Sequence, residues 1–292
     1  MMEDFIFRQL LFSTFAFATP LLLAALGELI GERAGVLNIG LEGMMLAGAW
    51  CGAAASYGSG QGWIGLLAAA SGGVVLAALF AFLTFTAKGD AIVVGTGINL
   101  LALGATGIAH RALGTHAPNY ASIPLPQWIF SLAGAMLVPL LWWFFKSTFA
   151  GLRLRAAGEY PLASEAAGIS VKRTRWIATL LNGALCGLAG AFLSMSHTNS
   201  FAENMTAGRG FIALAIVIFG RWNPLGALAA ALLFGAAEGA QFYLQTLFAN
   251  AAWGAIIYPL LLALPYIFTL LTLAGFAGKS RAPAALAQPL ED

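Results

Sequence analysis

The sequence predicts an all-α membrane protein in which about nine helices, within a range of roughly eight to ten, cross a lipid bilayer. Of its 292 residues, 60% are hydrophobic and only 9% are charged, and the mean hydropathy is +0.84. This leaves too little polar surface to cover a soluble globule. The apolar runs approach the ~20 residues that a helix needs to cross ~30 Å of hydrocarbon. They are continuous rather than alternating, which favours helices over an outer-membrane barrel.

Hydropathy separates the predicted spans from one another. They are residues 10–30, 39–57, 63–86, 92–113, 128–148, 176–197, 210–220, 225–245 and 252–273. The span at 210–220 is too short to cross a bilayer alone, so it either extends backward into the polar segment 204–209 or is a broken helix. Glu3 and Asp4 outnumber Arg8 at the start, which is the wrong charge for a secretory signal, so 10–30 is the first span.

The basic residues predict the orientation, because Lys and Arg gather on cytoplasmic loops. On alternate loops of the nine-span arrangement, eleven fall on one side: Arg33, Lys88, Lys146, Arg153, Arg155, Lys172, Arg173, Arg175, Arg221, Lys279 and Arg281. Three fall on the other: Arg8, Arg111 and Arg209. We therefore expect the N-terminus outside and the C-terminus in the cytoplasm. Several tryptophans lie at span ends, as interfacial anchors do: Trp63, Trp128, Trp176 and Trp253.

A polar island at 151–176 interrupts the apolar chain on the predicted cytoplasmic side. Pro161 suits the first turn of a helix and Gly168 suits a left-handed cap at its end. A helix of about two turns is unstable alone in water, so it needs a surface to pack against. Basic flanks would hold the island near the anionic inner leaflet at about 1 kcal/mol each. They are Arg153, Arg155, Lys172, Arg173 and Arg175. The plainer alternative is an ordinary cytoplasmic loop.

Three stretches carry a family resemblance. They are GLRLRAAGEYPLASEAAGISV at 151–171, ERAGVLNIGLEGMMLAGA at 32–49 and GFIALAIVIFGRWNPLGALAAALLFG at 210–235. The first resembles the cytoplasmic coupling loop of ABC importer permeases for branched-chain amino acids, simple sugars and nucleosides. The N-I-G-L-E-G core of the second is most similar to the nucleoside branch. The predicted layout also fits that branch, in which a first helix found in relatives is absent.

The resemblance implies a translocation subunit with a type II-like importer bundle and no ATPase activity of its own. No G-x-x-x-x-G-K-[ST] phosphate-binding loop occurs in the sequence. Residues 1–275 would form a single permease domain with a cytoplasmic coupling loop at 149–175, and 276–292 a short cytoplasmic tail. The coupling helix would fit a cleft of the ATPase and drive alternating access. The coupling residues implied are Arg155, Gly158, Glu159, Pro161, Ala163, Glu165 and Gly168.

The resemblance also implies the partners. They are one or more ATP-binding subunits that use ATP and Mg²⁺, a second permease subunit of the same or another sequence, an extracytoplasmic substrate-binding protein, and the lipid of the inner (plasma) membrane. This chain itself is expected to bind no cofactor, metal or nucleic acid. The binding protein would dock on the external loops at 114–127 and 199–209, although ordinary solvated loops explain their composition equally well.

Polar residues within the spans mark the candidate substrate pathway, because burying them in hydrocarbon is costly. They are Asn38, Glu42, Thr96, Asn99, Asn182, Glu238 and Gln241. Glu42 either lines the pathway or pairs with Arg33 or a backbone group. Glu238 either lines it or bridges helices with Gln241. Thr96 and Asn99 share one helical face, and such residues also join helices.

The remaining glycines and cysteines of the spans have plain structural roles, and other functions fit the sequence to different degrees. Gly183, Gly187 and Gly190 have the spacing of close helix packing. Cys51 and Cys186 lack metal-ligand spacing and fill the core. A permease for sugars such as ribose, and an ion-coupled transporter using Glu42 or Glu238, remain alternatives. A membrane-embedded enzyme fits less well, because H-E-x-x-H and G-x-S-x-G motifs are absent from the sequence.

Overall fold

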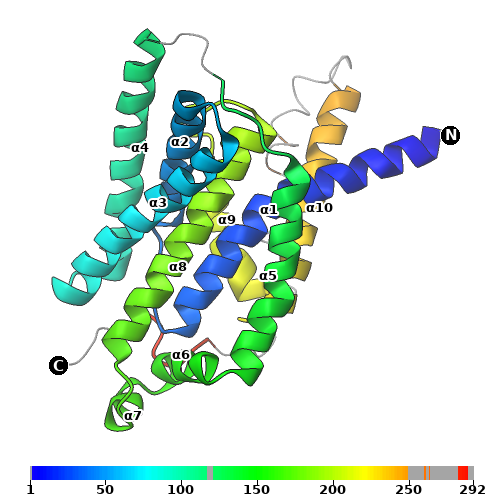
Figure 1. Ribbon diagram of the computed structural model, residues 1–292. Coiled ribbons are helices and arrows are strands. Elements are labelled where there is room, and N and C mark those ends of the chain that lie inside the picture. The colour runs from blue at the N-terminus through cyan, green and yellow to red at the C-terminus, as the bar shows by residue number, and fades with distance from the viewer. Residues whose placement is uncertain (1, 117–120, 249–259, 261–262, 264–281, 289–292) are drawn as a thin grey trace.

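The computed structural model describes residues 2–116, 121–248, 260, 263 and 282–288, and this part of the chain forms helices and loops without strands. The helices run up and down through one bundle (Figure 1). In chain order they are α1 (Met2–Arg33), α2 (Leu41–Ser59), α3 (Gly62–Ala81), η1 (Phe82–Thr86), α4 (Ala91–His116), α5 (Gln127–Ser147), α6 (Phe149–Glu159), α7 (Pro161–Ala166), α8 (Val171–Ala191), η2 (Phe192–His197), α9 (Arg209–Phe219) and α10 (Pro224–Phe248).

Six helical segments are long and apolar enough to cross a membrane, which confirms the all-α polytopic class. They are Leu10–Arg33, Gly62–Thr86, Ala91–Thr115, Gln127–Ser147, Val171–His197 and Pro224–Thr246. Helix α2 forms where a span was predicted but is not one of the six, and α9 is shorter. The predicted span at 252–273 lies outside the described residues. The count of nine and the orientation therefore stay predictions.

Burial separates central helices from peripheral ones. The apolar windows of α1 and α8 are 67% buried within the bundle, whereas those of α3, α4 and α5 are 28% buried. Glycines permit the central packing, because a Cβ added to Gly187 or Gly190 of α8 would overlap the backbones of α3 and α2. The close packing predicted from the glycine spacing is confirmed. The helices α3, α4 and α5 therefore expose more of their surface than the central helices do.

The short helix α9 is not extended backward, so that alternative is wrong. Residues 203–208 form turns, and Asn204, Ala207 and Gly208 have left-handed φ angles of 57°, 46° and 85°. A right-handed helix cannot continue through such residues. Helix α9 therefore begins at Arg209, and an irregular segment precedes it.

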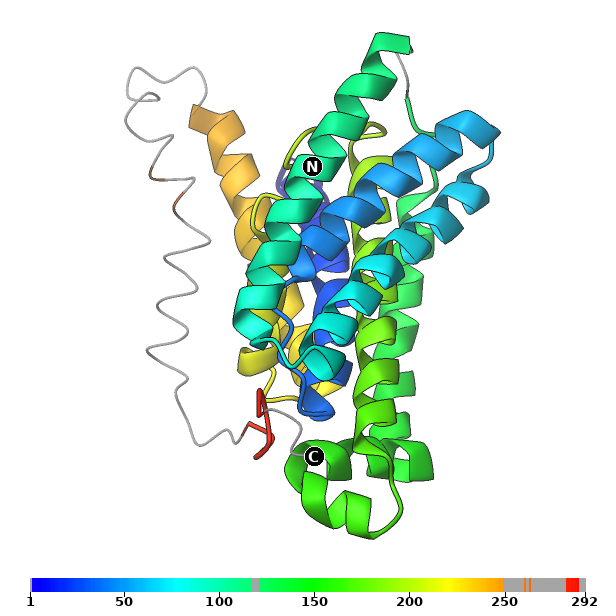
Figure 2. The same ribbon diagram turned by 90° about the vertical axis from the view of Figure 1, so that its left-hand side faces the viewer.

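The polar island contains two helices rather than one, and α6 was not predicted. Helix α7 starts at Pro161, and Gly168 has a φ of +80°, so the predicted start and cap are confirmed. Helices α6 and α7 lie at the end of the bundle opposite the N-terminus (Figures 1 and 2). The described tail segment 282–288 returns to this same end beside α6 (Figure 2).

Candidate functional site

The first polar site lies where α2 begins beside the start of α9. The Glu42 carboxylate accepts hydrogen bonds from the backbone N–H groups of Gly208 and Gly210, both at 2.7 Å. These N–H groups at the start of a helix have no partner within the helix, and the helix dipole favours a negative charge there. Gly210 must be small, since an added Cβ would lie 2.5 Å from the Glu42 nitrogen. Glu42 therefore pairs with backbone groups far along the chain, not with Arg33.

An ion pair extends this site from α9 to α10. Arg209 lies between the two glycines that bind Glu42, and its Nη2 donates to Glu238 Oε1 at 2.5 Å. Both side chains are largely but not fully enclosed, at 15% and 14% exposure. The partner that Glu238 finds across helices is therefore Arg209. Gln241, one turn further along α10, is buried at 7% exposure.

Asn99 joins α4 to the start of α2. Its Oδ1 accepts a hydrogen bond from the Gly43 N–H at 2.8 Å, and its Nδ2 donates to the Ile39 carbonyl at 2.9 Å. Thr96 takes no part in this contact, because it is exposed and its hydroxyl donates to the Ile92 and Val93 carbonyls of its own helix. Asn99 therefore joins two helices, whereas Thr96 bonds only within its own helix, although the two were expected to act together.

A second, enclosed polar cluster holds α1, α2 and α8 together. The Glu28 carboxylate accepts from the Asn38 N–H at 2.9 Å and from Asn182 Nδ2 at 2.6 Å, and all three residues are fully buried. Asn38 Oδ1 also accepts from the Gly40 N–H at 2.9 Å. The Cys186 thiol donates to Asn182 Oδ1 at 3.2 Å. The predicted pathway residues Asn38 and Asn182 thus share this cluster with a glutamate that the sequence analysis did not select.

One helical turn after Glu28, the end of α1 is hydrogen-bonded to the turn between α9 and α10. The indole N–H of Trp222 donates to Glu32 Oε2, and Arg33 Nε donates to the Trp222 carbonyl at 2.8 Å. Glu32 is 1% exposed, and its Oε1 has no hydrogen-bond partner. Trp222 itself has a left-handed φ of 54°. These contacts fix the α9–α10 turn against the bundle.

Aromatic rings lie beside the ion pair on α10. Phe17 of α1 stacks on Phe242 with ring centroids 4.9 Å apart, and it meets His197 edge-on at 5.3 Å. Phe242 keeps 46% of its surface exposed, whereas Phe17 is buried at 8%. Phe242 thus leaves part of its ring exposed on α10, one residue after the buried Gln241. Among the described residues, no cluster of His, Cys, Asp and Glu could hold a metal ion.

The predicted coupling residues lie at the α6–α7 end. Tyr160 and Leu162 are 71% and 66% exposed, and the predicted contacts Ala163 and Glu165 are exposed beside them. Gly158 is buried, and its carbonyl accepts from the Ala285 N–H at 2.9 Å. Glu159 is half-buried and accepts from the Ala284 N–H at 3.2 Å. Helix α7 therefore presents an open surface, while Gly158 and Glu159 at the end of α6 are hydrogen-bonded to the tail.

Comparison with known proteins decides the family. The model of the family described as branched-chain amino acid transport system / permease component matches residues 10–265. The chain belongs to this permease family. The chain is 35% identical over 306 residues to the guanosine ABC transporter permease protein NupQ of Bacillus subtilis, covering 95% of this chain and 94% of that protein.

Two further relatives match along most of the permease. The nucleoside ABC transporter permease protein NupC of Lactococcus lactis is 36% identical over 301 residues, covering 92% of each chain. A putative glucose ABC transporter permease of Haloferax volcanii is 34% identical over 301 residues, covering 91% of this chain and 90% of that one. No solved structure gives a significant match. The resemblance seen in the sequence is confirmed, and the permease is a multi-pass protein of the cell membrane.

The sequence of this permease carries a signal for Glu28 as well. Glu28 lies within the predicted span 10–30, where a carboxylate is costly unless it has partners. Glu28 is therefore a candidate for the same reason as Glu42 and Glu238. Arg209 gave no such signal, because it borders an apolar segment and was counted as a loop charge. The roles proposed for all these residues in a pathway stay predictions.

Proposed function

We propose that this permease moves nucleosides into the cell as the membrane subunit of an ABC importer. The observation that carries the proposal is the similarity to a guanosine permease along 95% of the chain. The nucleoside permease of Lactococcus lactis supports it over a similar length. ATP and Mg²⁺ would be used by separate ATPase subunits, and this chain would supply the path through the membrane.

The α7 surface fits the role of a coupling element. Its exposed side chains include an aromatic ring, a leucine and a carboxylate within one short segment, namely Tyr160, Leu162 and Glu165. A six-residue helix has little stability of its own, so a partner cleft would complete its packing. The basic side chains around it, Arg153, Lys172 and Arg173, are exposed and would meet acidic groups or anionic lipid. In this arrangement the α6–α7 end faces the cytoplasm.

The polar site around Glu42 and the Arg209–Glu238 pair is the proposed part of the pathway. A nucleoside presents ribose hydroxyls and a base with both donors and acceptors, and its flat base stacks on aromatic rings. Carboxylates, an arginine, the Gln241 amide and the exposed face of Phe242 match these needs. Asn38 and Asn182 would act indirectly, by holding the helices that carry these groups.

Further partners complete the importer. A second permease subunit would cover part of the exposed faces of the peripheral helices, and lipid the rest. A substrate-binding protein would dock at the end that carries the exposed Arg111–Glu203 ion pair, where the two charges are 2.8 Å apart. Exposed charges at the edge of an interface raise the rate of association more than the affinity.

Substrate choice is tested by uptake with competitors. Cells that express the permease with its ATPase and binding protein should take up labelled guanosine, and excess unlabelled adenosine or cytidine should compete. Glucose, ribose and leucine at the same excess should not compete. Competition by glucose alone, with no effect of nucleosides, would replace the nucleoside assignment with a sugar permease, for which the Haloferax volcanii relative is the precedent.

The coupling role of α7 is tested by truncating one exposed leucine. Leu162→Ala should weaken binding of the ATPase subunit by about tenfold, since interface anchors typically contribute more than about 1 kcal/mol. Leu152→Ala on α6 is the matched control, because Leu152 is 55% exposed in the same polar island. Binding of the purified ATPase is measured with both variants in detergent. Equal affinities for the two variants would mean that α7 is not the docking helix.

A further inference from the structure

The tail segment 282–288 is packed into the bundle instead of trailing away from it. Ala285 is 2% exposed, and Leu286 packs against the main hydrophobic core. The Ala285 N–H donates to the Gly158 carbonyl at 2.9 Å, and the Ala287 N–H donates to the Gly35 carbonyl at 3.2 Å. The tail therefore bonds at once to the end of α6 and to the turn after α1.

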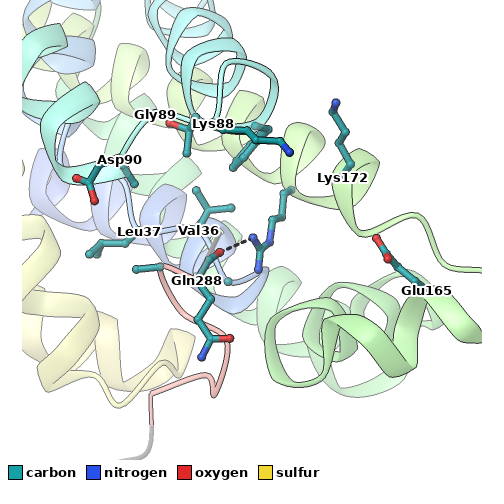
Figure 3. Close-up of a pocket in the computed structure, with 14 residues that line it drawn as sticks. Val36, Leu37, Lys88, Gly89, Asp90, Glu165, Lys172 and Gln288 are labelled. Atoms are coloured by element: carbon teal, nitrogen blue, oxygen red, sulfur yellow. Dashed lines mark hydrogen bonds between the residues drawn. The ribbon is translucent and has the colours of Figure 1, made fainter. Parts of the chain in front are cut away.

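Arg175 at the start of α8 is the side chain around which the tail is arranged. It is 2% exposed, so it cannot hold the protein at the membrane surface as its sequence position indicated. Its Nη1 donates to the Gln288 carbonyl at 2.9 Å, its Nη2 to the Ala285 carbonyl at 3.5 Å, and its Nε to the Ala34 carbonyl at 3.3 Å. Figure 3 shows the bond to Gln288 at the wall of a cavity of about 500 Å³.

No carboxylate within the described residues forms an ion pair with Arg175. Main-chain carbonyls therefore solvate the buried charge, and two of the three belong to the tail. A buried arginine needs such acceptors, because an unpaired buried charge is strongly unfavourable. The tail and the Arg175 side chain therefore stabilise each other.

The backbones of four segments meet closely beside Arg175. Gly35 has a left-handed φ of +86°, and a Cβ there would lie 3.0 Å from Arg175 Nη2 and 3.1 Å from the Ala285 carbonyl oxygen. A Cβ on Gly158 would overlap the Arg33 carbonyl. The end of α6, the turn after α1, the start of α8 and the tail thus converge on one junction.

We propose that the tail segment 282–288 is a brace that transmits movement of α7 to the membrane site, with Arg175 as its positioning residue. The proposal rests on the proposed function, in which α7 is driven by an ATPase. From Gly35 the chain leads within a few residues to Asn38, which binds Glu28, and to Ile39, which binds Asn99. Displacement of the end of α6 would therefore pass through the tail to the connector that precedes α2 and Glu42.

The brace is tested by placing the same bulky side chain at two adjacent tail positions. Ala285→Phe should dislodge the tail, because Ala285 is buried, whereas Ala284→Phe is the control, because Ala284 is exposed. Transport and ATP hydrolysis are measured in proteoliposomes that contain the whole importer. Ala285→Phe should lower guanosine uptake per ATP hydrolysed by about five- to tenfold, at the lower end of the roughly 5- to 150-fold coupling that is typical between two sites. Ala284→Phe should leave that ratio unchanged.

Four further variants separate a brace from a segment that only fills space. Deletion of residues 282–292 removes the tail without overpacking and should lower the same ratio. Arg175→Met should do so too, Arg175→Lys should recover part of the loss, and Ala285→Phe combined with Arg175→Met should be no worse than either alone. An unchanged ratio in the deletion variant would overturn the proposal, and so would failure of every tail variant to insert, because the tail would then serve folding only.

Failure of the brace and failure of the proposed function give different results. Wild-type proteoliposomes that show no ATP-driven guanosine uptake would refute the proposed function. Wild-type uptake with normal coupling in both the Ala285→Phe and deletion variants would refute the brace alone.

Discussion

Two pairs of glutamates lie in the bundle in opposite surroundings. Glu28 and Glu32 of α1 are 0% and 1% exposed, and their partners are a side-chain amide, an indole and a backbone N–H. Glu42 and Glu238 are only partly enclosed, and their partners are the start of α9 and an arginine. Enclosed carboxylates with neutral donors hold helices in register. We propose that the partly exposed carboxylates Glu42 and Glu238 exchange their present partners for a solute.

The largest effect is expected at the enclosed pair. Glu28→Ala would leave the Asn182 amide and the Asn38 N–H buried without a partner, at a cost of about 3 kcal/mol. For a protein of this size the melting temperature in detergent should fall by about 5–10 °C. Glu203→Ala serves as the control, because Glu203 is exposed, and it should leave the melting temperature unchanged. Equal melting temperatures would show that the enclosed cluster does not hold the fold.

The ion pair on α9 and α10 should instead affect transport more than folding. Arg209→Glu and Glu238→Arg each place two like charges in contact and should lower guanosine uptake by at least about tenfold. The double variant restores the opposite charges and should insert in the same amount as the wild type, without full uptake. Uptake is measured beside the amount of protein in the membrane. Full uptake by the double variant would assign the pair a structural role alone.

A smaller effect is expected from Glu42→Gln. The amide can still accept one backbone hydrogen bond from Gly208 or Gly210, but the charge at the start of α9 is lost, which costs about 1 kcal/mol. We expect uptake to fall by less than in the ion-pair variants and the melting temperature by less than in Glu28→Ala. Scanning calorimetry and uptake on the same preparation test this order. A loss of stability as large as that of Glu28→Ala would erase the distinction between the two pairs.

The smallest effect is expected at the exposed pair near the external end. The hydrogen bonds from Arg111 hold the pKa of the Glu203 carboxyl below its ordinary value of 4.5. Because that pKa is lowered in the folded protein, any stabilisation is present above pH 4.5 and is lost as the pH falls through the folded-state pKa. Arg111→Ala should therefore leave the melting temperature at neutral pH unchanged, since exposed pairs contribute little. A clear drop at neutral pH would contradict this.

The sequence predicts the helices better than it predicts their contacts. Hydropathy located the six apolar helices, and Pro161 and Gly168 located α7, because both signals are local. Helix α6 was missed because its residues also fit a polar loop. The packed tail was missed because Ala285 and Gly158 meet only after folding. The tail segment is short and consists mostly of small residues, so its sequence carries no local sign of burial.

In the candidate site too, the sequence predicts which residues matter but not which residues they contact. Glu42, Asn99 and Glu238 were selected because a polar group in an apolar run needs a partner. Their partners could not be inferred, since Gly208 is separated from Glu42 by 166 residues of sequence. Arg175 shows the opposite error: its charge and position indicated the membrane surface, whereas the tail supplies carbonyls that allow it to be buried.

Transport by the reconstituted importer shows whether this permease serves ATP-driven nucleoside import. Proteoliposomes containing the permease, its partner subunits and the binding protein are supplied with labelled guanosine, with ATP in one sample and a proton or sodium gradient in the other. We expect accumulation with ATP and none with either gradient, and no accumulation when the ATPase carries an inactivating substitution. Gradient-driven accumulation without ATP would contradict it and identify an ion-coupled transporter.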